Sequence, residues 1–164
     1  MFKLNFKKTL LNLFIILSIF SFDRLSKIYV LKIAELNDGI DIYVTSYLNL
    51  FLVWNKGVAF GLLSAEGDLM YNIVTVMILT ITLIVLLLIT KSKGLEKLAF
   101  ISVFGGATGN IFDRIYYSAV PDFIDVHIGD FHWFIFNIAD IFITMGVICL
   151  IYVEIFTDKI KNEK

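Results

Sequence analysis

Long apolar stretches separated by short polar segments dominate the hydrophobic pattern of the chain. Four of these stretches approach the ~20 residues that an α-helix needs to cross a hydrocarbon core of ~30 Å. They lie at about residues 10–31, 69–89, 95–115 and 134–156. The pattern predicts an all-α membrane protein in which four transmembrane helices form a single integral membrane domain over residues 1–164.

Charged residues interrupt the first of these spans. Its uninterrupted apolar part, from Leu10 to Phe22, would be only ~20 Å long as a helix. The helix must therefore continue through Asp23, Arg24 and Lys27. A cleavable signal peptide has the same basic start and short apolar run, and this alternative stays open. No small-x-small cleavage site follows the run, which favours a retained span.

The segment that follows the first span is expected to be extended. Residues 40–54 are rich in Ile, Tyr, Val and Thr with partial alternation, and Asn55, Gly57 and Gly61 interrupt the pattern. We expect a small extracytoplasmic β-sheet in this first outer loop. Residues 116–133 form the second outer loop in the same interpretation.

Composition supports the membrane assignment. The chain is 59% hydrophobic and 18% charged, with a mean hydropathy of +0.85, which is more apolar than a soluble domain of this length needs. Its net charge of −1 gives no basic surface for nucleic acid. Cys149 is the single cysteine and has no disulfide partner within the chain.

The lysines predict the orientation of the spans. Nine of the 14 Lys and Arg residues lie in three places that four spans put on one side. These are Lys3, Lys7 and Lys8 at the start, Lys91, Lys93 and Lys97 between the second and third spans, and Lys159, Lys161 and Lys164 in the tail. By the positive-inside rule that side, and with it both termini, is cytoplasmic.

Ionisable groups inside spans are costly, by roughly 2.5–3.5 kcal/mol each, so each one needs a partner or a purpose. Asp23 and Lys27 are four residues apart and share a helix face, where they can form an ion pair. Snorkelling at a helix end is an equally weighted alternative. Asp113 can pair with Arg114 or with a charge on the first span, and we expect that pair to be a structural clamp.

Other polar residues lie near the outer ends of the predicted spans. Gly105 and Gly109 are four apart, so a neighbouring helix can approach closely. Asn110 lies on the same helix face as Asp113 and Arg114. Asn137 can cap the start of the last span. The segment with Asn55 and Gly57 favours an ordinary loop turn over a binding role.

Asp122 and Asp140 are the two acids without an obvious adjacent cation, and both come to the outer face of the membrane. Two carboxyl groups that meet in a low-dielectric site cannot both ionise, so the pair shares a proton. One carboxyl can then activate water while the other polarises a carbonyl. This chemistry hydrolyses a peptide bond without a metal or a covalent nucleophile.

The sequence does not supply the residues that other hydrolytic mechanisms need. His127 and His132 are five apart in the second outer loop, without HExxH spacing or an evident third ligand. We expect a surface or interfacial role for both, and no metal site. No Ser lies in a GxSxG context, and no glycine-rich phosphate loop is present in the sequence.

Five blocks along nearly the whole chain resemble, in order, those of lipoprotein signal peptidase (signal peptidase II), the bacterial membrane aspartyl peptidase family. The blocks are Asp23 to Lys27, Asn55-x-Gly57-x-Ala59-Phe60, Gly109-Asn110-x-x-Asp113-Arg114, Val120-x-Asp122-Phe123 and Phe136-Asn137-x-Ala139-Asp140. Pro121 departs from the family, which more often has an aliphatic residue there. Its fixed φ and missing donor can alter the local approach to Asp122.

The resemblance implies that Asp122 and Asp140 are the catalytic pair. It implies a substrate site formed by Asn55, Gly57, Asn110, Arg114 and Asn137, and support from Asp23, Lys27 and Asp113. The implied substrate is a prolipoprotein whose cysteine carries diacylglycerol, cut just before that cysteine at the outer face of the bacterial cytoplasmic (inner) membrane. We expect no cofactor, a monomer among membrane lipids, and inhibition by globomycin-type cyclic peptides.

Two alternatives remain at the level of sequence. A transporter or channel subunit would use buried acids to relay ions, but it predicts acids spread through the depth of the membrane, whereas these cluster at one face. A noncatalytic membrane scaffold would need only close helix packing and would leave Asp140 unexplained.

Overall fold

Over residues 6–37, 39–57 and 68–162, which a computed structural model describes, the chain forms four helices and four strands. The helices are α1 (Phe6–Leu36), α2 (Asp68–Lys91), α3 (Gly94–Tyr117) and α4 (Ile138–Asn162). The strands are β1 (Asp41–Thr45), β2 (Leu48–Asn55), β3 (Val120–Ile128) and β4 (Phe131–Phe136).

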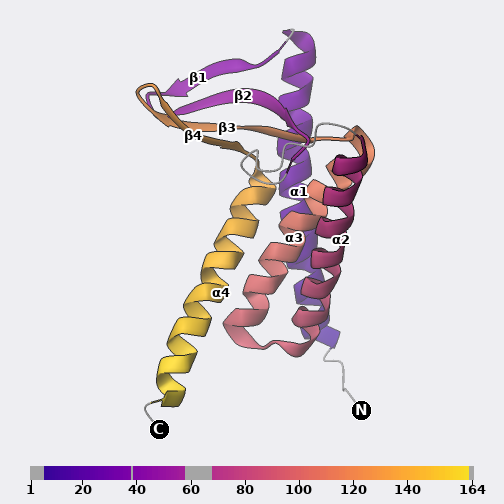
Figure 1. Cartoon of the computed structure of the whole chain (residues 1–164), viewed down its shortest axis with the longest axis vertical. Coiled ribbons are helices and arrows are strands. Elements are labelled where there is room, and N and C mark those ends of the chain that lie inside the picture. Colours follow the sequence, from indigo (N-terminus) through magenta and orange to yellow (C-terminus); the bar gives the residue numbers. More distant parts are fainter. Residues whose placement is uncertain (1–5, 38, 58–67, 163–164) are drawn as a thin grey trace.

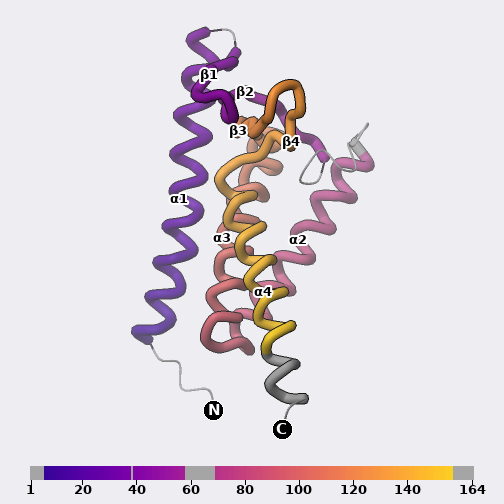
Figure 2. The backbone as a smooth tube through the Cα atoms, turned by 90° about the vertical axis from the view of Figure 1, so that its left-hand side faces the viewer, coloured from indigo at the N-terminus to yellow at the C-terminus, as the bar shows by residue number. Residues whose placement is uncertain are grey.

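The helices run side by side, and the sheet projects from one end of them (Figure 1). Helix α3 packs against α1, α2 and α4, and Figure 2 shows α1 and α2 on opposite sides of the α3–α4 pair. The start of α1 and the end of α4 both lie at the end opposite the sheet (Figure 1). The loops predicted to be external therefore meet at one end of the bundle.

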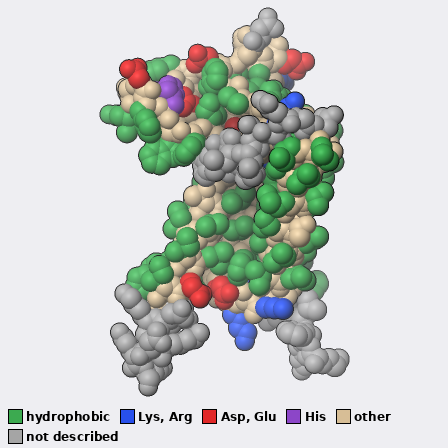
Figure 3. Space-filling view, in the orientation of Figure 1, with side chains coloured by type: hydrophobic (Ala, Val, Ile, Leu, Met, Phe, Trp, Pro, Cys, Tyr) green, Lys and Arg blue, Asp and Glu red, His purple; other side chains and the backbone are tan. Residues whose placement is uncertain are grey.

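Apolar side chains cover the outside of the bundle. Two helical segments, Leu69–Lys91 and Ile138–Phe156, are long and apolar enough to cross a membrane. Figure 3 shows hydrophobic side chains over the helical part of one face, with charged side chains near its two ends. Exposed apolar surface of this extent is expected where the surroundings are lipid rather than water.

Each predicted span coincides with a helix, but several boundaries differ, because α1 (Phe6–Leu36) extends beyond both ends of the predicted span and α4 continues past residue 156 to Asn162. Helix α1 runs unbroken through Asp23, Arg24 and Lys27, as its short apolar run required. The predicted start of the last span at Phe134 is wrong, because residues 134–136 belong to β4 and α4 begins at Ile138. Asn137 separates the strand from the helix.

The sheet is larger than the sequence predicted, because the second outer loop also forms strands. Its order is β1-β2-β3-β4 and every neighbouring pair is antiparallel. Strand β2 of the first outer loop needs a partner for its backbone groups, and β3 supplies one. Assigning the sheet to the first outer loop alone was therefore wrong.

Pairing between β2 and β3 sets the position of Asp122. Val53 lies opposite Asp122, and Asn55 lies opposite Val120. Since side chains two residues apart share one face of a strand, Asn55 and Asp122 are diagonal neighbours on the same face. On the packed side of the sheet, Phe123 contacts Val30 of α1.

Glycines allow α3 to approach α1 and α4 closely. A Cβ on Gly109 would lie 2.6 Å from Asp23 Oδ2, and one on Gly106 would lie 2.5 Å from the Ala139 carbonyl oxygen. At Gly105 the nearest atoms belong to the Ile19 side chain, at 3.1 Å. The close approach expected from Gly105 and Gly109 is confirmed.

We predict that Gly106→Ala lowers the thermal stability of the detergent-solubilised protein more than Gly105→Ala does. The added methyl group would overlap a backbone carbonyl oxygen at 2.5 Å at Gly106, whereas at Gly105 its nearest neighbour is the Ile19 side chain at 3.1 Å. Overpacking of this kind costs about 1–3 kcal/mol. Thermal unfolding of the two variants beside the unchanged chain measures the difference, and equal midpoints would contradict the packing.

Candidate active site

A lysine buried between α1 and α3 organises the base of the site. Lys27 Nζ donates to Asp23 at 2.9 Å, to Asp113 Oδ2 at 2.6 Å and to Asn110 Oδ1 at 3.0 Å. The side chains of Lys27, Asp23 and Asp113 are fully buried. An ammonium group has three donors and no acceptor, so these oxygens satisfy it completely.

The same network ties α1 to α3 and to the start of α4. Arg24 Nη2 lies 2.5 Å from Asp113 Oδ1, and its guanidinium group stacks over the Phe112 ring. Asp23 Oδ1 accepts a hydrogen bond of 3.1 Å from the backbone N–H of Ala139. Asp113 therefore pairs with charges on the first helix and not with Arg114, which agrees with one of the two predicted alternatives.

Asp122 is buried and bound by amide side chains. Asn55 Nδ2 donates to its Oδ2 at 2.9 Å, and Asn137 Nδ2 donates to its Oδ1 at 2.6 Å. Asn55 is oriented in turn by the backbone N–H of Gly57, which donates to its Oδ1 at 2.8 Å. Hydrogen bonds thus connect both Asn55 and Gly57 to Asp122, so this turn also orients a side chain of the candidate site.

Asp140 lies in the first turn of α4 and is held from two sides. Its backbone N–H donates to Asn137 Oδ1 at 3.0 Å, and the backbone N–H of Asn137 donates to Asp140 Oδ2 at 3.1 Å. This reciprocal pair is a capping box, so the predicted cap at Asn137 is confirmed. Asn110 Nδ2 donates to the other oxygen of Asp140 at 2.8 Å.

Two asparagines connect these groups. Asn137 contacts both Asp122 and Asp140, which brings carboxylates from β3 and α4 to one place. Asn110 accepts from Lys27 through its oxygen and donates to Asp140 through its nitrogen. The buried cation therefore fixes which way the Asn110 amide faces, and that orientation offers Asp140 a donor.

Burial makes Asp122 a group that titrates near neutrality. Its pKa is raised from 3.8 to about 7, chiefly because burial penalises the charged form. The Asp140 carboxylate raises the pKa of Asp122 as well, whereas hydrogen bonds from Asn55 and Asn137 lower it. At neutral pH this carboxyl is poised between accepting and donating a proton.

Arg114 and an apolar cavity adjoin the carboxylates. Arg114 is buried, donates to the Gly57 carbonyl oxygen, and stacks on the Tyr71 ring, whose hydroxyl donates to the Arg114 carbonyl oxygen. Its Nε and Nη1 have no hydrogen-bond partner among the described residues. A cavity of about 440 Å³ between α2, α3 and α4 has Asn110, Arg114 and Asp140 in its lining and is otherwise largely apolar.

The structure brings all ten sequence-predicted site residues to the sheet end of the bundle, in one connected set of contacts. Sequence reasoning missed the part that Arg24 and Tyr71 play in it. Arg24 carried a signal, because a second basic residue beside Asp23 also needed a buried partner. Ala59 and Phe60, which belong to the second predicted block, lie outside the described residues.

The sequence matches a known family over most of its length. The family model described as Signal peptidase (SPase) II matches residues 15–156. A lipoprotein signal peptidase of Pelagibacter ubique (strain HTCC1062) is 53% identical over 163 residues, which cover 99% of this chain and 98% of that protein. Another, of Anaplasma phagocytophilum (strain HZ), is 39% identical over 154 residues, covering 91% of this chain and 94% of that protein.

Solved structures with a similar fold are also found. Two of them are each described as a bacterial membrane enzyme structure by the in meso method. One has a TM-score of 0.69 and 27% identity, and covers 93% of this chain and 91% of its own. The second has a TM-score of 0.64 and 29% identity, with coverage of 87% and 90%.

We predict that Lys27→Met destabilises the protein by about 3–5 kcal/mol, because it leaves two buried carboxylates without their shared cation. Denaturant unfolding in detergent measures the change. Lys32→Met is the matched control, since Lys32 is an exposed lysine on the same helix. A loss of stability no greater than that of the control would contradict the network.

We predict that the Asp122 carboxyl titrates with a midpoint near pH 7 and that Asp140→Asn lowers this midpoint, because it removes a neighbouring negative charge. Infrared difference spectra of the protein with ¹³C-labelled aspartate, assigned by the band that Asp122→Asn removes, measure both values. Asp130→Asn, an exposed acid in the β3–β4 turn, is expected to leave the midpoint unchanged. A midpoint near 4 in the unchanged chain would refute the assignment.

Proposed function

The chain belongs to the signal peptidase II family of peptidases that process prolipoproteins, and we propose that Asp122 and Asp140 are its catalytic pair. In this proposal it cleaves diacylglyceryl-modified precursors just before the lipidated cysteine. The observation that carries the proposal is the meeting of these two acids, one from β3 and one from α4, at Asn137. Asp122 accepts a hydrogen bond from the Asn137 side-chain amide, and Asp140 accepts one from the Asn137 backbone N–H.

The proposed mechanism uses one shared proton. The ionised carboxyl takes a proton from a water molecule, whose oxygen attacks the scissile carbonyl carbon. The protonated carboxyl donates to the carbonyl oxygen and stabilises the developing negative charge. The tetrahedral intermediate then collapses as the C–N bond breaks, and the leaving amine takes up a proton from the pair. A pKa of about 7 for Asp122 supports proton exchange near neutral pH.

Asparagines position the pair in this mechanism. Asn55 and Asn137 hold Asp122, and Asn110 holds Asp140. Neutral amide donors orient a carboxylate without adding the full positive charge that would keep it ionised. Lys27 hydrogen-bonds to Asn110, which in turn holds Asp140, and so makes the support of the pair more rigid.

Arg114 and the adjoining cavity suit a lipidated peptide. The unpartnered N–H groups of Arg114 can donate to backbone carbonyl oxygens of the precursor. The cavity's apolar lining from α2, α3 and α4 can accept an acyl chain while the peptide lies at Asp140. A substrate confined to the membrane would thus reach the carboxylates from the lipid side.

The proposed topology has four spans, with both termini in the cytoplasm and the site near the outer face of the bacterial cytoplasmic membrane. The lysines near the ends of α1, α2 and α3 support this orientation. Helices α1 and α3 carry too much charge to resemble ordinary spans, but their charged groups Asp23, Lys27 and Asp113 are buried against one another. We expect a monomer that needs no cofactor and is inhibited by globomycin-type cyclic peptides.

The observations support a transporter or channel subunit and a noncatalytic scaffold less well than they support a peptidase. Membership of a peptidase family argues against a transporter subunit and against a scaffold. The buried acids of the described residues also lie at the sheet end of the bundle, where a path for ions across the membrane would need them at several depths.

We predict that Asp122→Asn and Asp140→Asn each reduce cleavage of a diacylglyceryl-modified precursor by at least ~10³-fold while the protein stays folded, because the amide can neither take up nor release the shared proton. A gel-shift assay with purified protein and lipidated precursor measures the rate. Asp41→Asn, an exposed acid at the start of β1, serves as the control. Full cleavage by either variant of the pair would rule out the mechanism.

A further inference from the structure

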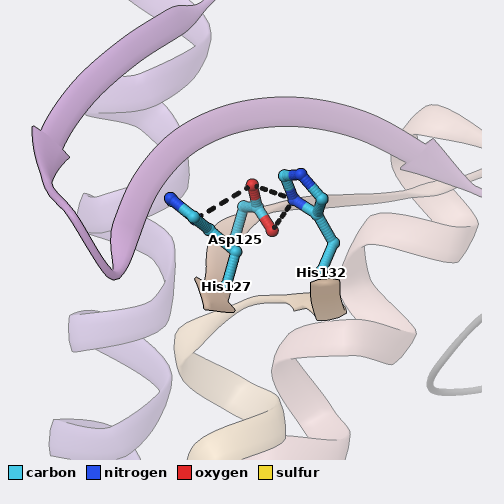
Figure 4. A group of neighbouring side chains, drawn as sticks. All are labelled: Asp125, His127 and His132. Atoms are coloured by element: carbon cyan, nitrogen blue, oxygen red, sulfur yellow. Dashed lines mark hydrogen bonds and ion pairs between the residues drawn. The ribbon is translucent and has the colours of Figure 1, made fainter. Parts of the chain in front are cut away.

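A second cluster of titratable side chains lies on the sheet, outside the proposed catalytic site. Asp125 and His127 project from β3, and His132 projects from β4 toward them (Figure 4). His127 and His132 are paired across the two strands, and their rings stack 5.1 Å apart. In the sequence these histidines lacked a third ligand, and the sheet supplies one.

The separations within the cluster suit a single bound ion. His132 Nδ1 forms a hydrogen bond of 2.9 Å with Asp125 Oδ2, a contact that a bound ion would replace, and His127 Nδ1 lies 3.7 Å from the same oxygen. One ligand atom from each residue lies within 4.8 Å of the other two. Zinc bonds of 2.0–2.2 Å in tetrahedral geometry place neighbouring donors roughly 3.3–3.5 Å apart. Small side-chain rotations would bring the three donors to that spacing.

His127 provides an independent sign that the cluster is incomplete. Its side chain is buried, which corrects the expected surface position, and its Nδ1 has no hydrogen-bond partner in the part of the chain that the structure describes. The atom faces Asp125 from beyond hydrogen-bond distance. Buried polar atoms are normally satisfied, so an unsatisfied imidazole nitrogen beside a carboxylate indicates a missing partner.

We propose that Asp125, His127 and His132 bind a divalent transition-metal ion of the zinc class. Two imidazoles and one carboxylate suit zinc, whereas magnesium and calcium need mainly oxygen ligands. His132 has 57% of its side chain exposed, so the fourth position faces solvent and an ion can enter there. This site is separate from the proposed peptidase chemistry.

The position of the ion indicates what it does. It would join β3 to β4 at a point where the pairing register shifts between Asp125 and His127. Asp122 lies three residues earlier on the same strand. A bound ion would therefore stiffen the strand that carries Asp122 without touching the carboxylate itself.

The experiment measures zinc binding to the full chain in detergent, purified without a polyhistidine tag and stripped with a chelator. Titration calorimetry is expected to give one Zn²⁺ per chain, and excess Mg²⁺ is expected not to displace it. Substituted Co²⁺ is expected to give the visible absorption of tetrahedral coordination. A thermal scan with and without Zn²⁺ should show a higher unfolding midpoint with the ion.

His132→Gln is the main variant, because the His132 side chain is 57% exposed and the glutamine amide can still donate to Asp125. We expect its zinc affinity to fall at least tenfold, with a similar fall for Asp125→Asn. Asp130→Asn removes an exposed acid from the same β3–β4 hairpin and is expected to bind zinc as the unchanged chain does. Absence of zinc binding in the unchanged chain, or equal affinity in folded His132→Gln, would overturn the proposal.

Discussion

The rest of the structure depends on the hydrogen bonds and ion pairs that the ammonium group of Lys27 makes. Burying one cation beside two carboxylates is favourable only when every donor and acceptor is satisfied, and a single missing partner is costly. The three donors of Lys27 are satisfied by Asp23, Asp113 and Asn110. Asp23 also accepts a hydrogen bond from the first turn of α4. The relative positions of α1, α3 and α4 are therefore fixed. The amide that faces Asp140 is placed by the same constraint.

Much of this arrangement could be predicted from the sequence, for identifiable physical reasons. Helix positions followed from apolar length, and the ion pair of Asp23 and Lys27 followed from their spacing of four residues. Asp122 and Asp140 stood out because no cation was adjacent to either. Each inference rested on the free-energy cost of leaving a polar or charged group without a partner in a membrane. This cost is large, so few arrangements of the chain avoid it.

Contacts made by the sheet could not be predicted in the same way. The pairing of β2 with β3 joins residues about 70 positions apart, and neither strand has a local signal that names its partner. The strand over residues 120–128 was not predicted, because it contains Pro121, Asp122 and Asp125, and these residue types are depleted in strands. The position of Asp125 between two histidines depends on the register of β3 and β4, which the chain sets only after folding.

The order of the site along the chain affects how the molecule is made. Asn55 leaves the ribosome well before Asp122 and Asp140, and Asp140 lies on the last helix. Asn137, which hydrogen-bonds to Asp122, emerges just before Asp140. A nascent chain in the translocon therefore holds an incomplete set of groups until the final helix inserts. In the proposed function, the set of groups needed for hydrolysis would therefore be complete only once the last helix is in place.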